Sequence, residues 1–513
     1  MPQKINIIGI GGTGMRCLES FVHLCAIGMM DDTVVNILAL DTDARNGNFT
    51  RLKELISDYQ QLSPNEPAKD TFFSAKINYY EFSPNYDGAD FNKVINYTAA
   101  STENTEEDAN VRKSDLVDLF LTPEQRRMNL EHGYRAQTQM GSLLMYRAII
   151  GEAVTKKRRP DLKSGLIDFL TKSGLGSEPG QKVFIFGSVF GGTGASSIPV
   201  LPDALNKALK IYKGTSAVDI LKGNYFGTVV LTNYFSFPKP EGEVVADSDF
   251  FSLNSQAALM FYEKDASVRE TYKRMYLIGR EIPTPLPSKA PSTTGGSEQR
   301  NPADFIELVS AMAAYDFFRN IESDTETGKF YYIGFDKDLT LLDFVNFTAT
   351  DAAKFKKRFG TAMAAAITNA RGSFFDYLVG AYYKDVKQDT ELKALNDYFK
   401  RLLDLAGPGG QDGWAQQLAD SAKKVFGSDT AFLLNNEVFD PAVAAKDKKY
   451  NQRLFADKVG APAFDVSWGF GDTIYNKVRN TIQNDVEHAA EKHTTLLQLI
   501  RDTYDTFVKL YNL

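Results

Sequence analysis

The sequence has few of the residues that build disulfide frameworks and metal centres. Its 513 residues include two cysteines, Cys17 and Cys25, and four histidines, and their spacing forms no cluster of ligands. Two cysteines are too few for a disulfide scaffold or a zinc finger, and this sparse use of cysteine is typical of a reducing compartment. We therefore expect a cytoplasmic protein without a zinc site.

Long apolar runs and an excess of basic residues are also missing. No segment reaches the roughly 18 consecutive apolar residues of a membrane-spanning helix, and residues 1–5 lack the pattern of a signal peptide. The chain carries 58 Lys and Arg against 65 Asp and Glu, which gives a net charge of −7. Overall electrostatic attraction to nucleic acid is therefore disfavoured, and we do not expect nucleic acid as a partner.

Short apolar segments bounded by glycine and polar residues are the first positive signal. They have the length and composition of buried strands, and helical patterns separate several of them. Continuous apolar strands joined by helices predict an α/β fold with a mostly parallel sheet that helices cover on both faces. The predicted strands are residues 4–10, 34–40, 182–187, 227–232, 274–279 and 329–335.

Two further regions complete the predicted organisation. Residues 45–110 are polar and mixed, and we expect an insertion with loops there. Beyond residue 350, helical periodicity predicts a mainly α-helical C-terminal region, so we expect two domains, residues 1–345 and 346–513. The periodic segments are 352–382, 389–406, 413–426 and 470–510.

A first glycine loop follows the first predicted strand. Residues 9–14 (GIGGTG) match the G-x-G-x-x-G pattern and precede a predicted helix, so backbone amides at the helix start can face a phosphate. Asp41 ends the next strand, where a dinucleotide-binding fold keeps the acid that contacts ribose. Taken alone, this loop indicates either an NAD- or flavin-dependent enzyme or a tight strand–helix turn.

A second glycine loop, residues 191–194 (GGTG), also joins a buried strand to a helix. Two such loops suit a polyphosphate that is held from two sides, whereas a dinucleotide-binding domain needs one. Neither loop is a Walker A motif, because no Gly-Lys-Ser/Thr follows. Thr13, Thr193 and Ser196 could donate hydroxyl hydrogen bonds to phosphate oxygens, and helix capping would use the same hydroxyls.

The residues GGTGAS at 191–196 resemble the signature loop of the tubulin/FtsZ superfamily. Other segments resemble its motifs and occur in the same order, so the resemblance covers about residues 1–340. Within the superfamily, the chain is most similar to the divergent prokaryotic tubulin-like proteins. The matching segments are GIGGTG at 9–14, LDTDARN at 40–46, GYRAQTQMG at 133–141, LTNYFSFPKPEG at 231–242 and DFIELVSA at 304–311.

The resemblance implies a Rossmann-like GTPase domain over residues 1–345, with GTP or GDP and Mg²⁺ as ligands. It also implies self-association into an oligomer or filament, or docking of a partner protein, in cytoskeletal or membrane-remodelling work. Asp41 and Asp43 would hold the magnesium ion, in keeping with the preference of hard cations for carboxylates. The implied nucleotide contacts are Gly11, Gly12, Thr13, Gly14, Gln137, Gly191, Gly192, Thr193, Gly194 and Ser196 for the phosphates, Glu241 for the ribose, and Arg16, Asn301 and Asp304 for the base.

The chain departs from the FtsZ pattern at three places. Arg16 stands where FtsZ has an asparagine that reads guanine, and Gln137 begins a Gln-Thr-Gln segment in place of Asn-Pro-Glu. After residue 320 no acidic loop has the family's spacing, so we assign no catalytic residue. GTP hydrolysis is then weak, completed by a neighbouring subunit, or absent, which would make the chain a nucleotide-binding scaffold or switch.

The region before residue 305 has two interpretations. Asn301, Pro302 and Asp304 together form a strong helix start, with Asn301 at the N-cap. This capping role explains Asn301 and Asp304 without any contact to a nucleotide base.

Overall fold

The computed structural model describes residues 2–43, 45–84, 138–236, 251–279, 284–285, 303–321, 328–334 and 389–406, with individual positions between 122 and 134, 296 and 299, and 350 and 366. Its centre is a seven-stranded sheet in which every strand pair is parallel, in the order β3-β2-β1-β4-β5-β7-β9. This confirms the predicted α/β class and the Rossmann-like sheet. The strands are β1 (Gln3–Ile10), β2 (Thr33–Leu40), β3 (Lys76–Phe82), β4 (Lys182–Ser188), β5 (Tyr225–Leu231), β7 (Tyr272–Gly279) and β9 (Lys329–Gly334).

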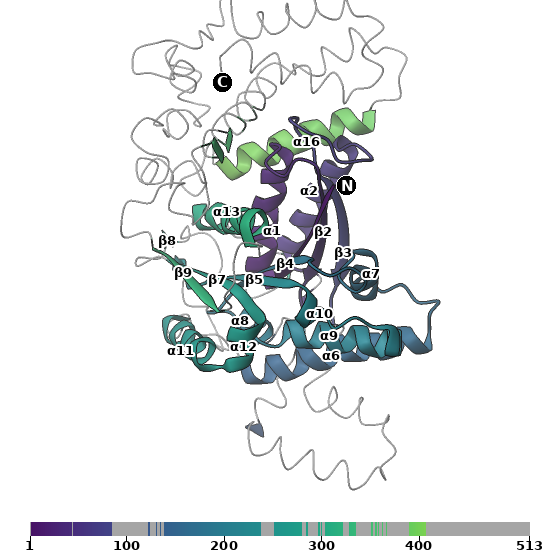
Figure 1. Ribbon diagram of the computed structural model, residues 1–513. Helices are drawn as coiled ribbons and strands as arrows, with labels where there is room; N and C mark the ends of the chain where they lie inside the picture. The colour runs from purple at the N-terminus through teal and green to yellow at the C-terminus, as the bar shows by residue number, and fades with distance from the viewer. Residues whose placement is uncertain are drawn as a thin grey trace, which may run out of the picture.

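Helices cover both faces of this sheet (Figure 1). One face carries α1 (Gly11–Ala26), α2 (Gly47–Leu62), α13 (Phe305–Asn320) and α16 (Asp389–Ala406). The opposite face carries α6 (Thr138–Arg158), α7 (Gly165–Lys172), α8 (Gly192–Ser197), α9 (Leu201–Lys213), α10 (Ile220–Gly223), α11 (Phe251–Lys264) and α12 (Ala266–Thr271). Strands β6 (Phe235–Ser236) and β8 (Thr284–Pro285) form a separate two-stranded parallel pair. No helix among the described residues is both long and apolar enough to cross a membrane.

Each face of the sheet has its own hydrophobic core. Aromatic side chains fill the core beneath α1 and α13, where the ring of Phe184 lies 5.3 Å from those of Phe186 and Phe317 and 6.0 Å from that of Phe318. Such edge and tilted contacts between rings add to the stabilisation that comes from burial. The packing of α13 on the centre of the sheet therefore accounts for part of the phenylalanine-rich composition.

Three asparagines form a ladder across β1, β2 and β3. Asn6, Asn36 and Asn78 occupy paired positions in the register of these strands. The Asn78 side-chain amide donates to Asn36 Oδ1 at 2.9 Å, and the Asn36 amide donates to Asn6 Oδ1 at 3.1 Å. Asn6 and Asn36 are buried, and these bonds satisfy Asn6 Oδ1 and both polar side-chain atoms of Asn36, whereas Asn6 Nδ2 has no partner among the described residues.

The structure corrects the expectation of a loop-rich insertion for residues 45–84, and the rest of that stretch, residues 85–110, lies outside the described residues. Helix α2 and strand β3 lie within residues 45–84, and β3 is the strand at one edge of the sheet. Their pattern is partly polar because α2 exposes one face and because most of β3 is only half-buried. An edge strand lacks the continuous apolar run that marked the central strands.

Helix α13 also begins later than predicted. Its N-cap is Asp304, whose side chain accepts from the backbone of Ile306, and Glu307 completes a capping box. Asn301 is therefore not the N-cap of this helix. In this capping box, the side chains of Asp304 and Glu307 each accept a hydrogen bond from a backbone amide at the start of the helix.

The predicted helix at 389–406 is confirmed as α16, which lies along α2 (Figure 1). Its side chains Leu395, Tyr398 and Phe399 are buried in the same core as α1. Arg401 pairs with Asp58 and Glu54 on α2 at 3.0 and 3.1 Å. The other predicted C-terminal helices fall wholly or largely outside the described residues.

Two glycines allow α1 to approach the sheet closely. A Cβ on Gly14 would lie 2.8 Å from the carbonyl carbon of Gly9 and 2.9 Å from the carbonyl oxygen of Phe186, both backbone atoms. We predict that Gly14→Ala lowers the free energy of unfolding by about 1–3 kcal/mol, since the strands cannot move away cheaply. Urea denaturation monitored by circular dichroism measures this change.

Gly151, in the middle of α6, provides the matched control. A Cβ there would meet nothing within 4 Å, so Gly151→Ala should raise the free energy of unfolding by about 0.5–1 kcal/mol. Equal effects of the two substitutions would contradict the close approach of α1.

Candidate functional site

The candidate site lies where the strand order changes direction. From β1 the chain moves outward through β2 and β3, and from β4 it moves outward to β5, β7 and β9 on the other side. Helices α1 and α8 therefore start next to each other, at the carboxyl ends of the two central strands β1 and β4. In open parallel sheets, this switch point leaves a crevice in which ligands bind.

The two glycine loops face one another across this point. Gly11 has a φ of +67°, which favours glycine, and a Cβ on it would lie 3.4 Å from Cβ of Thr193 in the second loop. The hydroxyl of Thr193 is also 3.5 Å from the hydroxyl of Thr42, which follows β2. Three loops that are far apart in the sequence thus converge on one position.

The first-turn amides of α1 are not used by a capping side chain. Its N-cap is Ile10, which has no polar side chain, and Gly191 is likewise the N-cap of α8. Gly12, Thr13 and residues 191–193 are only half-buried. Free amides at the start of a 16-residue helix, together with its dipole, favour an anion at this position.

Other residues of the predicted phosphate set have structural partners. The Ser196 hydroxyl is buried and donates to the carbonyl of Thr193 at 3.0 Å within α8. A Cβ on Gly194 would lie 2.4 Å from the carbonyl oxygen of Ser188, as tight as the position of Gly14. These residues shape the loops, and direct contact with a phosphate remains a prediction for them.

Asp41 is a buried carboxylate with one unused oxygen. Its Oδ1 accepts from the backbone of Asp43 at 3.2 Å, whereas its Oδ2 has no hydrogen-bond partner among the described residues. Burial raises the pKa of Asp41 to about 7, and the charge of Asp43 adds to this, against the lowering effect of hydrogen bonds from the backbone of Asp43 and Thr42. An unsatisfied carboxylate oxygen of this kind fits a cation such as Mg²⁺.

Asp43 is more fully engaged than Asp41. Its two oxygens accept from the backbones of Arg45 at 3.0 Å and Gly296 at 2.6 Å. A second hydrogen bond joins the same two parts of the chain, because Gln299 accepts from the side-chain amide of Asn46. No group of three or more acidic, histidine or cysteine side chains that could hold a metal occurs among the described residues. A magnesium ion here would take its remaining ligands from water and a bound phosphate.

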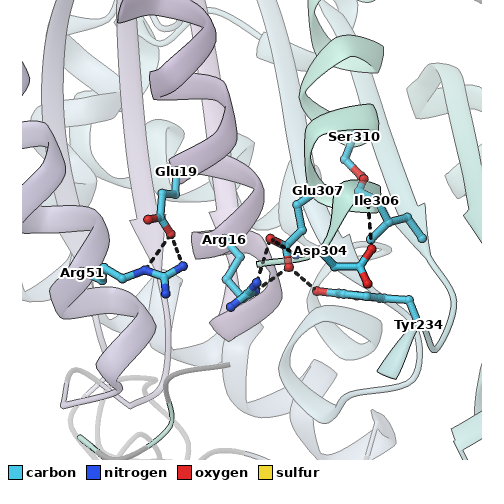
Figure 2. A network of polar contacts seen from close by, with 8 residues as sticks. All are labelled: Arg16, Glu19, Arg51, Tyr234, Asp304, Ile306, Glu307 and Ser310. Atoms are coloured by element: carbon cyan, nitrogen blue, oxygen red, sulfur yellow. Dashed lines mark hydrogen bonds and ion pairs between the residues drawn. The ribbon is translucent and has the colours of Figure 1, made fainter. Parts of the chain in front are cut away.

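Arg16 and Asp304, both predicted to read the base, belong to a buried network between α1 and α13 (Figure 2). Arg16 donates to both carboxylate oxygens of Glu307, at 2.5 and 2.8 Å, and the Tyr234 hydroxyl donates to the same carboxylate at 3.0 Å. The backbone of Asp304 donates to Glu307 at 3.3 Å. Burial would lower the pKa of Arg16, but the adjacent Glu307 carboxylate outweighs this and raises it above its ordinary value.

The network continues from α1 to α2. Glu19, one turn after Arg16, is buried and accepts two hydrogen bonds from Arg51, at 2.9 and 2.5 Å (Figure 2). Burial opposes ionisation of Glu19, yet the charge of Arg51 and its hydrogen bonds hold the pKa below the ordinary range. Helix α1 is thus fixed on two sides by ion pairs.

Sequence reasoning did not select three residues that the structure places at the crevice. Thr42 contacts Thr193, Asn46 caps α2, and Asn48 lies beside Gly12. The signal was present in the sequence DTDARNGN, because Asn before a helical pattern is a capping signature. Three selected residues, Gln137, Glu241 and Asn301, lie outside the described residues.

Comparisons with known proteins add little to these observations. No protein-family model matches the chain, and no curated protein matches it. Among solved structures, TubZ of the Clostridium botulinum phage c-st, in a form with a truncated C-terminal tail, is similar with a TM-score of 0.25 and 13% sequence identity. The similarity covers 63% of this chain and 62% of that one. The site is therefore interpreted from its own residues.

Asp41 makes stability depend on pH in a defined direction. Its pKa is about 7 in the folded chain against 3.8 ordinarily, so the folded state holds an extra proton between these values. The stability that the protonated carboxyl provides is therefore lost as the pH rises from about 4 to about 7, and the loss is complete above that. We predict that Asp41→Asn stabilises the ligand-free protein by on the order of 2–4 kcal/mol at pH 8, and by little at pH 4. Thermal unfolding across this range tests it, and a pH-independent difference, or an equal effect of the half-exposed Asp168→Asn, would contradict it.

The stabilising effect of the Arg16–Glu307 ion pair can be tested by substitution. Arg16→Met should lower the free energy of unfolding by about 3–5 kcal/mol, because it leaves the Glu307 carboxylate buried without its counter-charge. Adding Glu307→Gln removes that charge and keeps an acceptor for Tyr234, so the double variant should recover much of the loss. Denaturant titrations of both variants provide the measurement. The exposed pair Lys172–Asp168 serves as control, since Lys172→Met should cost less than about 1 kcal/mol.

Proposed function

We propose that this chain is a tubulin-like protein that binds GTP or GDP with Mg²⁺ between its two glycine loops. The observation that carries the proposal is the convergence of Gly11, Thr42 and Thr193 around the uncapped N-terminus of α1. The unpartnered oxygen of Asp41 supports a bound cation on the same side of the crevice. The preference for guanine rests on the resemblance of the sequence motifs.

In this proposal, the chain binds phosphate without a lysine. The amides of the Gly11–Gly14 segment donate to one phosphate, and residues 191–194 approach from the opposite loop. Asp41, and Asp43 through water, hold magnesium, which neutralises phosphate charge next to two carboxylates. Dependence on magnesium is therefore a requirement of the arrangement, because without the ion the acids would repel the nucleotide.

The proposed consequence of binding is self-association or docking of a partner protein. Large apolar side chains are exposed on α11 and β9, where Leu253, Met260, Phe261 and Phe330 are 59%, 50%, 50% and 39% exposed. Met260 and Phe330 also line a cavity of about 660 Å³. Exposed apolar groups gathered near a hollow are suited to protein contacts. GTP hydrolysis in this proposal is weak or completed by a neighbouring subunit, and the alternative is a switch that binds without turnover.

Nucleotide binding by the purified protein tests the proposal. Calorimetry with GTP, ATP and NAD in the presence of Mg²⁺ should show binding of GTP that is lost when Mg²⁺ is removed. Gly192→Trp, at the half-buried start of α8, should weaken it at least about 100-fold by filling the crevice, whereas Gly151→Trp on α6 should leave it unchanged.

The other outcomes separate the alternatives. NAD binding that survives Gly192→Trp would overturn the proposal in favour of an enzyme that uses the first loop alone. The absence of binding for all three nucleotides would overturn it altogether. GTP binding without phosphate release, and without assemblies that sediment on centrifugation, would favour the switch that binds nucleotide and does not hydrolyse it.

A further inference from the structure

Asn48, the second residue of α2, is a buried amide without hydrogen-bond partners. Its side chain is 1% exposed, and neither its Nδ2 nor its Oδ1 is bonded to any described residue. Its neighbour Asn46 differs, because its Oδ1 accepts from the Asn48 backbone at 2.8 Å and its Nδ2 donates to Gln299. A buried polar group without a partner costs about 1–3 kcal/mol, and a ligand that binds at the crevice and accepts from this amide would remove that cost.

The position of Asn48 indicates that use. A Cβ on Gly12 would lie 3.3 Å from Asn48 Nδ2, so the amide lies beside the first turn of α1. Gly12 itself is half-buried and belongs to the uncapped turn that presents free backbone amides. The side-chain N–H donors of Asn48 and the backbone N–H donors of α1 therefore form one set, drawn from two helices.

We propose that Asn48 donates a hydrogen bond to an oxygen of the phosphate group bound at the first glycine loop. This inference rests on the proposed function and deepens it by assigning a phosphate contact to α2. The chain has no lysine in its glycine loops, and Asp41 and Asp43 lie nearby, so a neutral donor is valuable here. A side chain at Gly12 would crowd the Asn48 amide, and glycine avoids this contact.

The ligand-free protein provides the first readout. Because the amide has no partner without ligand, Asn48→Ala should leave the melting temperature unchanged or raise it. A purely structural role for Asn48 would instead lower the melting temperature, and this result would overturn the proposal. Asn65→Ala, at an exposed asparagine after α2, is the matched control for both measurements.

Binding of GTP with Mg²⁺ provides the second readout. Loss of a hydrogen bond to a charged group should weaken GTP binding by Asn48→Ala roughly 10- to 100-fold. Asn48→Asp should weaken it further, because a carboxylate donates nothing and repels phosphate. If Asn48 held the magnesium ion through its oxygen, Asn48→Asp would bind as well as the wild type or better, and the phosphate contact would be overturned.

Two further results keep the test decisive. Asn48→Leu repeats the binding test without opening a cavity, because leucine keeps the shape of the amide side chain and donates no hydrogen bond, and it should weaken GTP binding by the same factor as Asn48→Ala. If the wild type binds GTP and neither variant changes the affinity, this inference fails while the proposed function stands. If the wild type does not bind GTP, the proposed function fails and the inference with it.

Discussion

The buried ion pair between Arg16 and Glu307 joins the second turn of α1 to the first turn of α13. The same carboxylate takes hydrogen bonds from Tyr234, beyond β5, and from the backbone of Asp304. One carboxylate therefore relates three segments that leave different strands of the sheet. Because both charges are buried, a movement of either helix alone would leave a buried charge without its partner, which costs several kcal/mol. This ion pair fixes the position of α1 and therefore that of the first glycine loop at its start.

The position of this loop explains why polar groups line one side of the crevice and closely packed backbone lines the other. Close packing at Gly14 and Gly194 fixes the backbone behind the two loops, while Gly12 and Thr193 stay accessible in front. The acids at the end of β2 face a set of neutral donors, and no lysine from either loop intervenes.

The sequence predicts the central strands and the edge strand β9, and it misses the opposite edge strand β3. The strands that became β1, β2, β4, β5 and β7 are continuous apolar runs, which only a doubly covered sheet requires. β3 and α2 each keep a polar face, so their sequences lack the apolar pattern that predicts a buried strand or helix. The convergence of the two glycine loops followed from their positions after strands. The ion pair of Arg16 with Glu307 could not be predicted, because the two residues lie 291 positions apart and no local pattern indicates such a contact. Asn48 was missed for a similar reason, since burial without a partner is a property of the fold and not of the sequence.

The asparagine ladder of Asn6, Asn36 and Asn78 has a consequence for how the sheet assembles. A slip of one residue between neighbouring strands would turn a whole set of side chains to the opposite face. A slip of two residues preserves the apolar pattern, so hydrophobic burial alone discriminates weakly against it. It would, however, separate the amides and leave buried polar atoms unpaired, at about 1–3 kcal/mol for each. The strands of a parallel sheet pair across long connections, so incorrect registers can form during folding. The ladder makes these incorrect registers less stable than the native one, so that the strands separate and pair again.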